Sequence, residues 1–261
     1  MKEHYAAEIT DESKNELVEF IRWYNHFLGH KPLIVGGWAA WAYHKGIGSK
    51  DIDVVFPQSR TMHQSLLQFF KSRGYEHRKV DLFDYEFFKT RTTPSGRKVE
   101  VLIDAVSADR RVRVTGTALT IPWQLAEKYK RTFSFAENAE AYIIEPELLF
   151  AYKIGALIGR SNSLKTATEA ERLHYQSKLW KDAQDLLGLF QNAKPRPKVL
   201  GQVLQDCGLD DKWLEQAFSI AANNGVFAWL CSKHDKWIAV KSANTLAVDI
   251  VMHEKWHEIN D

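Results

Sequence analysis

The chain has 261 residues, of which 45% are hydrophobic and 26% are charged. These proportions are typical of globular proteins and exclude a largely disordered chain. Thirty-five Lys and Arg residues against 33 Asp and Glu residues leave a net charge of +2, so any binding of a polyanion must depend on a local basic patch.

The cysteine content and the apolar runs limit the cellular setting. Cys207 and Cys231 are too few for a disulfide framework and lack the spacing of a metal site. No apolar run is long enough to cross a membrane, and the polar, acidic start lacks the hydrophobic segment of a signal peptide. We therefore expect a soluble cytoplasmic protein with no membrane partner.

The first part of the chain alternates between helical and strand-like patterns. A short apolar strand is expected to end at Gly36-Gly37, and a later strand is expected to end before Pro57. The predicted elements are a helix over 11–29, a strand over 33–35, a helix over 38–45, a strand over 52–56 and a helix over 61–73.

The second part of the chain begins with strands and then becomes helical. Thr93-Pro94-Ser95-Gly96 predicts a turn between a β-rich stretch over 78–92 and a strand over 98–106. Short strands are expected near 117–121 and 141–144, followed by helices over 146–160, 167–191, 197–206, 211–223 and 243–257. The pattern predicts an α/β first half and a helical second half, with a boundary near 106–122 or near 145.

Two carboxylates at the start of a strand give the clearest chemical signal. Asp51 and Asp53 are two residues apart, so their side chains point to the same face of the sheet. Adjacent carboxylates repel unless cations lie between them, which is the arrangement of a two-metal site. Gly36 and Gly37 precede a helix, where backbone N–H groups and the absence of a Cβ favour phosphate.

A third acid is needed to complete the metal shell or to accept a proton from an attacking hydroxyl. Glu100 and Asp104 both lie on the strand after the predicted hairpin, and a spacing of four puts them on one face. Strand geometry alone does not choose between these two residues.

The run GGWAAWAYHKGIGSKDIDVVF resembles the nucleotidyltransferase superfamily, which includes DNA polymerase beta and the aminoglycoside nucleotidyltransferases. The shared pattern is a glycine pair, about ten residues, and Ser-x-Asp-hydrophobic-Asp, and the similarity covers roughly residues 30–106. The approach Arg97-Lys98-Val99-Glu100 resembles the strand that carries the third acid, which favours Glu100 with Asp104 second. The resemblance implies an α+β fold, with a mixed-sheet catalytic core over 1–121 and an α-helical domain over 122–261.

The helical part is similar to the AbiE/MenT branch of toxins in this superfamily. Two cations seven residues apart lie on one helical stripe, and the run Lys178–Leu187 holds a further charged cluster. The resemblance implies that Gly36, Gly37 and Ser49 hold phosphates, that Lys153 contacts the triphosphate, and that other helical residues bind or position the nucleotide. These other residues are Arg160, Lys181, Asp182 and Asp185.

The resemblance implies a metal-dependent nucleotidyltransferase. Asp51, Asp53 and Glu100 would hold two Mg²⁺ ions, or Mn²⁺, and an NTP would donate a nucleoside monophosphate to an acceptor hydroxyl. RNA, most plausibly a tRNA 3′ end, is the expected acceptor, with an antitoxin protein as a further partner. The alternatives are a nucleotidyltransferase acting on an aminoglycoside-like antibiotic, a protein-modifying enzyme, or a non-catalytic NTP-binding module.

Two other motifs carry weaker signals. His253-Glu254-Lys255-Trp256-His257 matches the zinc-protease motif, but no third ligand follows it, so we interpret it as a polar helical face. Arg110-Arg111-Val112-Arg113 is either a phosphate-contacting patch or a charged edge strand.

Overall fold

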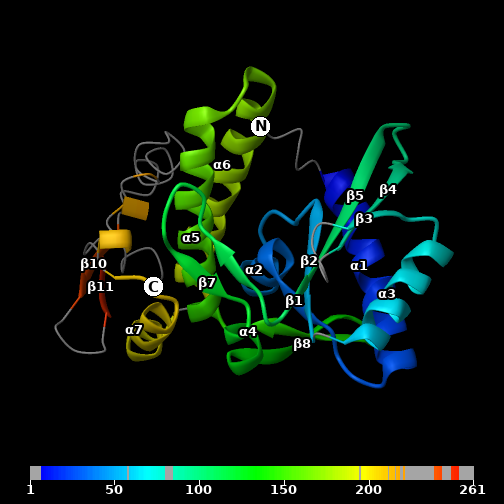
Figure 1. Cartoon of the computed structure of the whole chain (residues 1–261), viewed down its shortest axis with the longest axis horizontal. Coiled ribbons are helices and arrows are strands. Elements are labelled where there is room, and N and C mark those ends of the chain that lie inside the picture. The colour runs from blue at the N-terminus through cyan, green and yellow to red at the C-terminus, as the bar shows by residue number, and fades with distance from the viewer. Residues whose placement is uncertain are drawn as a thin grey trace. The chain divides into compact units, whose positions relative to one another are not determined.

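The computed structural model divides the chain into two compact units (Figure 1). The sheet unit comprises residues 1–110 and 122–145, and the helical unit comprises residues 111–121 and 146–261. The structure describes residues 7–57, 59–79, 85–193, 195–210, 212–214, 216–217, 220, 238–242 and 248–252.

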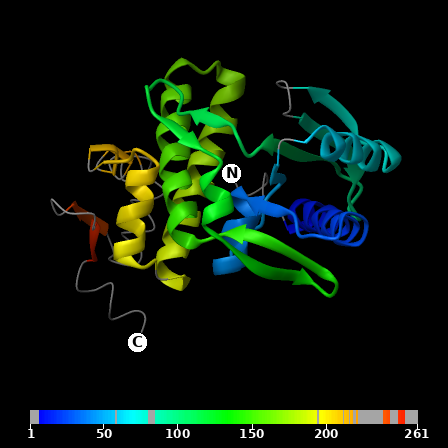
Figure 2. The same cartoon turned by 60° about the horizontal axis from the view of Figure 1, so that its bottom comes forward.

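The sheet unit is built on a seven-stranded mixed sheet with the order β3-β4-β5-β2-β1-β9-β8. Its strands are β1 (Leu33–Val35), β2 (Asp51–Phe56), β3 (Glu76–Lys79), β4 (Tyr85–Thr92), β5 (Lys98–Ser107), β8 (Lys130–Ala136) and β9 (Ala139–Ile144). The pairs β2–β5 and β1–β9 are parallel, whereas the other neighbouring strands are antiparallel. In Figure 2, β8 and β9 form the green hairpin at the lower right.

Four helices accompany this sheet: α1 (Ala7–Leu28), α2 (Gly36–His44), α3 (Arg60–Ser72) and the short α4 (Leu125–Lys128). Phe20 of α1 stacks on Phe70 of α3, and Phe70 in turn contacts Phe87 of β4. Since Phe87 contacts Phe70, its side chain lies on the side of the sheet that α1 and α3 cover, which we call the helix face. Side chains alternate along a strand, so its neighbours in β4 project to the other side.

The side chains of α1 and α3 supply much of the core of the sheet unit. Phe20, Phe70 and Phe87 are all almost fully buried, as are Ile52 and Ile103 on the central strands. Burying large aromatic side chains contributes strongly to stability. This packing fixes the sheet against α1 and α3 and determines which side chains of β2 and β5 point away from the helices.

The helical unit contains α5 (Pro146–Thr166), α6 (Glu169–Asn192) and α7 (Pro197–Asp206), together with two small sheets. The first small sheet pairs β6 (Arg111–Arg113) with β7 (Thr120–Pro122), and the second pairs β10 (Ile238–Ser242) with β11 (Val248–Met252). Thr168 begins α6 with a capping box, because its side chain and that of Glu171 each bond the other's backbone N–H.

The fold class expected from the sequence is confirmed: a mixed sheet with helices is followed by the helices α5, α6 and α7. The helix predicted over 243–257 is wrong, because residues 248–252 form β11. The segment Val248-Asp249-Ile250-Val251-Met252 is rich in β-branched residues, which favour a strand. The strand β8, which begins with Lys130 and Arg131, was not predicted.

The model also bears on membrane association. Among the described residues, no helix combines the length and the apolar composition that crossing a lipid bilayer would require.

Candidate functional site

The two aspartates predicted as metal ligands lie at the start of β2 on the side of the sheet opposite the helix face. Ile52 and Val54 are buried, whereas Asp51 and Asp53 are half-buried. This alternation places both carboxylates on one face, as their spacing predicted. We call this side the carboxylate face.

The parallel strand β5 brings a third acid to the same face. Asp104 is the register partner of Asp53, and Leu102 is the partner of Asp51. Register partners on neighbouring strands project to the same side, so Asp53 and Asp104 lie next to each other. Asp104 is half-buried, and its Oδ1 atom is shielded from solvent.

Glu100 shares the carboxylate face but lies farther along β5. Its register partner is Thr90 on β4, and it precedes the segment of β5 that pairs with β2. Its side chain is exposed. The register therefore favours Asp104 over the sequence-based choice of Glu100 as the neighbour of Asp53.

The glycine pair lies where the sequence placed it, at the first residues of α2. Gly36 has a φ of +63°, and a Cβ built on it would meet Asp53 Oδ2 at 1.9 Å. A side chain at this position would be strained and would displace the carboxylate. Gly37 is buried in the first turn, and within the described part of the chain no side chain caps this helix start. The Asp53 carboxylate therefore lies against the positive end of α2.

Ser49 lies in the connection between α2 and β2 and is buried. Ser49 stands two residues before Asp51, the first residue of β2. The structure thus brings Gly36, Asp51, Asp53 and Asp104 into one region of the sheet unit and places Ser49 at the approach to it.

Sequence reasoning missed two charged residues on the carboxylate face. Glu86 of β4 is the register partner of Asp104, and Arg78 of β3 is the partner of Glu86. Arg78 Nε donates a hydrogen bond to Glu86 Oε2. Glu86, and more weakly Asp104 and Glu100, raise the pKa of Arg78. The β-rich character of 78–92 was visible in the sequence, but the register with β5 was not.

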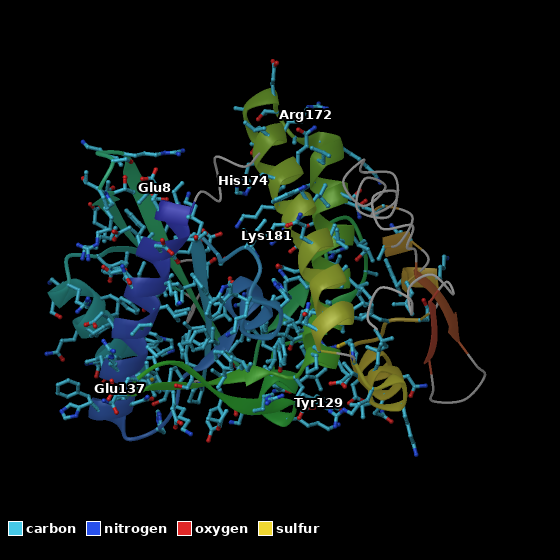
Figure 3. All side chains as sticks on the ribbon, turned by 180° about the vertical axis from the view of Figure 1, so that it is seen from behind. Glu8, Tyr129, Glu137, Arg172, His174 and Lys181 are labelled. Carbon is cyan, nitrogen blue, oxygen red and sulfur yellow. The ribbon has the colours of Figure 1, made fainter. Side chains whose placement is uncertain are left out.

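The helical unit gathers the five charged residues predicted on α5 and α6. Lys153 Nζ lies 2.8 Å from Asp182 Oδ1 and 2.6 Å from Asp185 Oδ2. Lys181 Nζ lies 2.8 Å from the same Asp185 oxygen, and Arg160 pairs with Asp182 Oδ2. We call these five residues the α5/α6 cluster; Lys181 is labelled in Figure 3.

The α5/α6 cluster is mostly buried and carries three positive and two negative formal charges. Both aspartates and Lys181 are almost completely buried, and the Arg160 side chain is the most exposed of the five at 31%. Burial, together with the nearby Lys153 and Lys178, lowers the pKa of Lys181 to about 8, although Asp185 acts in the opposite direction. The cluster therefore holds two lysines and an arginine close together.

Another buried carboxylate, that of Glu147, lies at the start of α5. Glu147 Oε1 accepts hydrogen bonds from the Arg196 backbone N–H at 2.8 Å and from its Nε at 2.9 Å. Burial alone would raise the pKa of Glu147, but these hydrogen bonds lower it below its usual value. This interaction joins α5 to the residue before α7 and supports the helix that carries Lys153.

The arginine run 110–113 contains the strand β6. Arg111 donates hydrogen bonds to the Thr120 hydroxyl and carbonyl, and Arg113 donates one to the Thr117 carbonyl. Both arginines are exposed. They brace the β6–β7 turn, as expected for a charged edge strand, and remain accessible to anions. The motif His253–His257 lies outside the described residues.

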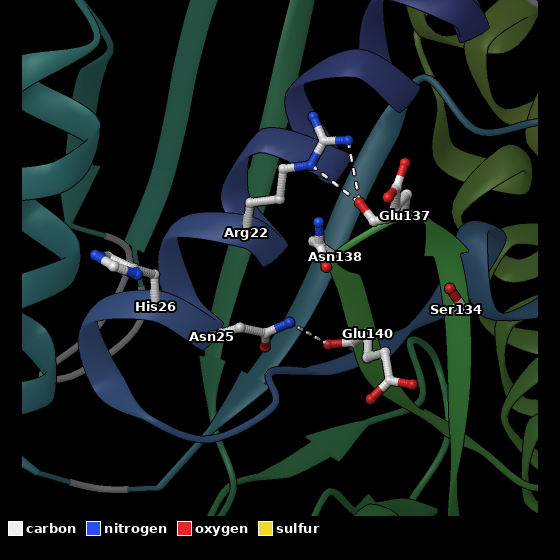
Figure 4. Close-up of a pocket in the computed structure, with 7 residues that line it drawn as sticks. All are labelled: Arg22, Asn25, His26, Ser134, Glu137, Asn138 and Glu140. Carbon is white, nitrogen blue, oxygen red and sulfur yellow. Dashed lines mark hydrogen bonds between the residues drawn. The ribbon is translucent and has the colours of Figure 1, made fainter.

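Among the described residues, no three His, Cys, Asp or Glu side chains converge to hold a metal ion by themselves. A groove of about 790 Å³ lies elsewhere in the sheet unit, between α1 and the β8–β9 hairpin (Figure 4). Arg22 and Asn25 of α1 donate hydrogen bonds across it to the carbonyls of Glu137 and Glu140. None of the residues predicted for the site lines this groove.

Comparisons with known proteins add little to this geometry. No protein-family model matches the sequence, and no curated protein matches it. The fold is similar to the crystal structure of an antigenic nucleotidyltransferase-like protein from Paracoccidioides brasiliensis. The match has 16% identity, covers 86% of this chain and 89% of that chain, and has a TM-score of 0.45. A similarity of this size assigns neither a family nor an activity.

Proposed function

We propose that the protein is a metal-dependent nucleotidyltransferase that transfers a nucleoside monophosphate from an NTP to an acceptor hydroxyl and releases pyrophosphate. One observation carries this proposal. Asp53 lies beside Asp104 on neighbouring parallel strands, two residues after Asp51, with its carboxylate against Gly36 at the start of a helix. This combination supplies oxygen ligands for cations next to a helix N-terminus suited to phosphate.

The donor set fits Mg²⁺ whose coordination shell is completed by the phosphates of the nucleotide and by water. Mg²⁺ is usually bound by one or two carboxylates together with substrate phosphates and water, rather than by a cage made only of protein. The absence of a preformed three-ligand group among the described residues is consistent with that mode. Asp51, Asp53 and Asp104 would hold the ions, and Mg²⁺ or Mn²⁺ would supply charge neutralisation for the transferred phosphoryl group.

The chain's own groups would orient the substrates. Backbone N–H groups of Gly36 and Gly37, with the Ser49 hydroxyl, would bind phosphate oxygens. The acceptor oxygen would attack the α-phosphorus while the bond to the bridging oxygen breaks and pyrophosphate leaves. Asp104 would accept the proton of the acceptor hydroxyl. Stabilisation of the charge on the transferred group would be the main source of the rate acceleration.

In the helical unit we propose that Lys153 and Arg160 neutralise the β- and γ-phosphates. Asp182 and Asp185 each contact cations of the cluster at hydrogen-bond distance, which supports a positioning role for these carboxylates. Lys181 would share Asp185 with Lys153 and so limit the movement of both side chains. Charged side chains held in place in this way should bind phosphate more tightly than flexible surface lysines, because they lose little conformational entropy on binding.

We propose RNA, at a tRNA 3′ end, as the acceptor, in a toxin with a cognate antitoxin. Its support is the sequence resemblance of the α5/α6 cluster and the exposed arginines Arg111 and Arg113. A cationic small molecule of the aminoglycoside type is the second candidate. It is favoured by two further acids on the carboxylate face, Glu86 beside Asp104 and Glu100 farther along β5.

Labelling with each α-³²P NTP tests both acceptors. The protein is incubated with Mg²⁺ and either total tRNA or a panel of aminoglycosides, and the products are separated by electrophoresis or chromatography. We expect labelled tRNA with one preferred NTP, and no label with Asp53→Asn. Labelled aminoglycoside would replace the RNA proposal, and labelled protein would indicate a protein-modifying enzyme.

Two further results bear on the wider proposal. NTP binding without pyrophosphate release under any of these conditions would contradict the enzymatic proposal and indicate a nucleotide-binding module. For the toxin role, we expect expression of the wild-type protein to arrest bacterial growth and Asp53→Asn to relieve that arrest. Normal growth with the active enzyme would overturn the toxin role alone.

A further inference from the structure

We propose that Glu86 is a fourth carboxylate of the cation site, beside Asp51, Asp53 and Asp104, and that its ion pair with Arg78 sets the affinity of this site for divalent cations. The inference rests on the proposed function, because it concerns the same cation site. It adds two tuning residues that lie outside the Gly-Gly and Asp-x-Asp motifs.

The sheet register supplies the geometry. Arg78, Glu86, Asp104 and Asp53 are successive register partners on β3, β4, β5 and β2, so they form one row across four neighbouring strands. Partners in such a row project to the same face, and directly opposite side chains have Cβ atoms roughly 5 Å apart. Glu86 is therefore as close a neighbour of Asp104 along the sheet as Asp53 is.

The charges along this row explain why an arginine ends it. Two carboxylates directly opposite each other on adjacent strands repel. Arg78 offsets the charge of Glu86 through its hydrogen bond to Glu86 Oε2. The Arg78 side chain is 69% exposed, whereas that of Glu86 is 24% exposed, so the carboxylate is the more sheltered member of the pair. Asp104 and Glu100 also act electrostatically on Arg78, which places the guanidinium within range of the site.

The effect on cation binding follows from the charge of each variant. Arg78→Ala leaves the negative charge of Glu86 beside Asp104, so a divalent cation should bind more tightly. Glu86→Gln leaves the positive charge of Arg78 near the site, so the cation should bind more weakly. The double variant removes both charges and should return close to the wild-type affinity. Unit charges a few ångströms from a partly exposed site change affinity by about three- to ten-fold.

Mn²⁺ binding to the full-length protein without nucleotide gives a readout independent of turnover. Isothermal titration at low ionic strength would measure Kd for the wild type, the two single variants and the double variant. A second exposed pair, Arg22 with Glu19 on α1, provides the matched control, because it lies on the helix that covers the opposite face. Arg22→Ala and Glu19→Gln should leave the Mn²⁺ affinity unchanged. Circular dichroism would confirm that each variant is folded.

The outcomes separate this inference from the function on which it rests. Opposite shifts for Arg78→Ala and Glu86→Gln, with the double variant restored, would support it. Unchanged Mn²⁺ affinity in both single variants, while Asp53→Asn abolishes binding, would overturn the tuning role and leave the proposed function intact. Mn²⁺ binding that survives in Asp53→Asn and Asp104→Asn would instead contradict the cation site itself.

Discussion

Two constraints act on Gly36: its left-handed backbone conformation and its close approach to the Asp53 carboxylate. The two constraints can be tested separately. A Cβ at Gly36 would be strained at a φ of +63° and would also overlap the Asp53 carboxylate. Gly74 has a similar φ of +75°, but a Cβ there would meet nothing within 4 Å. Forcing a non-glycine residue into this left-handed region costs about 1–2 kcal/mol.

We therefore expect Gly74→Ala to lower the free energy of unfolding by about 1 kcal/mol and to leave nucleotidyl transfer intact. Gly36→Ala should cost more stability and should also abolish activity, because Asp53 must move. Thermal unfolding and the α-³²P NTP assay measure the two effects. Equal activity in both alanine variants would show that the contact between Gly36 and Asp53 has no role in the reaction.

The choice between Asp104 and Glu100 is also decided at single residues. Because Asp104 is the register partner of Asp53, we expect Asp104→Asn to lower kcat by about a hundred-fold or more. Glu100→Gln, at an exposed position on the same strand, should change kcat by only a few-fold. Both rates come from pyrophosphate release at saturating NTP. The reverse order of effects would restore Glu100 as the third acid.

At the scale of elements, the α5/α6 cluster predicts an unusual pH dependence. The folded pKa of Lys181 is about 8, below its ordinary value of 10.5. Between these values the unfolded chain binds the proton and the folded chain does not, so the contribution of Lys181 to stability rises with pH. Below about pH 8 both states are protonated and folding carries the full cost of a buried charge.

We expect the stability of the wild type relative to Lys181→Met to increase between pH 7.5 and pH 10. Methionine does not titrate and has a similar length, so other titrating groups cancel in the comparison. Chemical unfolding at several pH values supplies the free energies. A constant or falling difference over that range would mean that Lys181 stays charged in the folded protein.

The elements themselves were predictable where local signals were strong. Pro57, Gly74 and the Pro94–Gly96 turn marked the ends of strands and helices, and the helix over 197–206 was predicted at its observed bounds. β8 was missed because its sequence KRTFSFA begins with two cations and only one of its side chains, that of Phe135, is buried. For such an edge strand, stability comes from pairing with β9 rather than from its own hydrophobic pattern.

At the scale of the whole molecule, the order of strands predicts where the chain tolerates truncation. β1 lies between β2 and β9 in the sheet, and β9 comes from residues 139–144. A chain ending at residue 121 lacks β8 and β9 and leaves the apolar strand β1 as an open edge. Such an edge promotes aggregation.

We expect a fragment of residues 1–145 to be soluble and to unfold cooperatively, and a fragment of residues 1–121 to be insoluble. Size-exclusion chromatography and thermal unfolding of both fragments would show the difference. A folded, monomeric fragment of residues 1–121 would show that the sheet does not need β9.

How much of the site was predictable depends on sequence separation. The i,i+2 spacing of Asp51 and Asp53 and the glycines at the start of α2 are local features, and the structure places both as expected. Asp104 depends on the register of β2 with β5, which are distant in the chain. Glu86 and Arg78 depend on the registers of the consecutive pairs β4–β5 and β3–β4, which residue spacing alone does not fix. Register is set by the packing of residues such as Phe87 and Ile103 on the helix face, which a spacing rule does not contain.

The parallel pairing of β1 with β9 also governs how the protein is made. A growing chain can form α1, β1, α2 and β2 once residue 56 is clear of the ribosome, and the contact of Gly36 with Asp53 needs no later residue. The free side of β1 stays open until β9 has been synthesised, more than a hundred residues after β1. At ribosomal speeds of about 5–20 residues per second this gap lasts several seconds. During this interval, an unfinished chain carries the Asp51 and Asp53 carboxylates next to an apolar strand edge that chaperones, or other nascent chains, can bind.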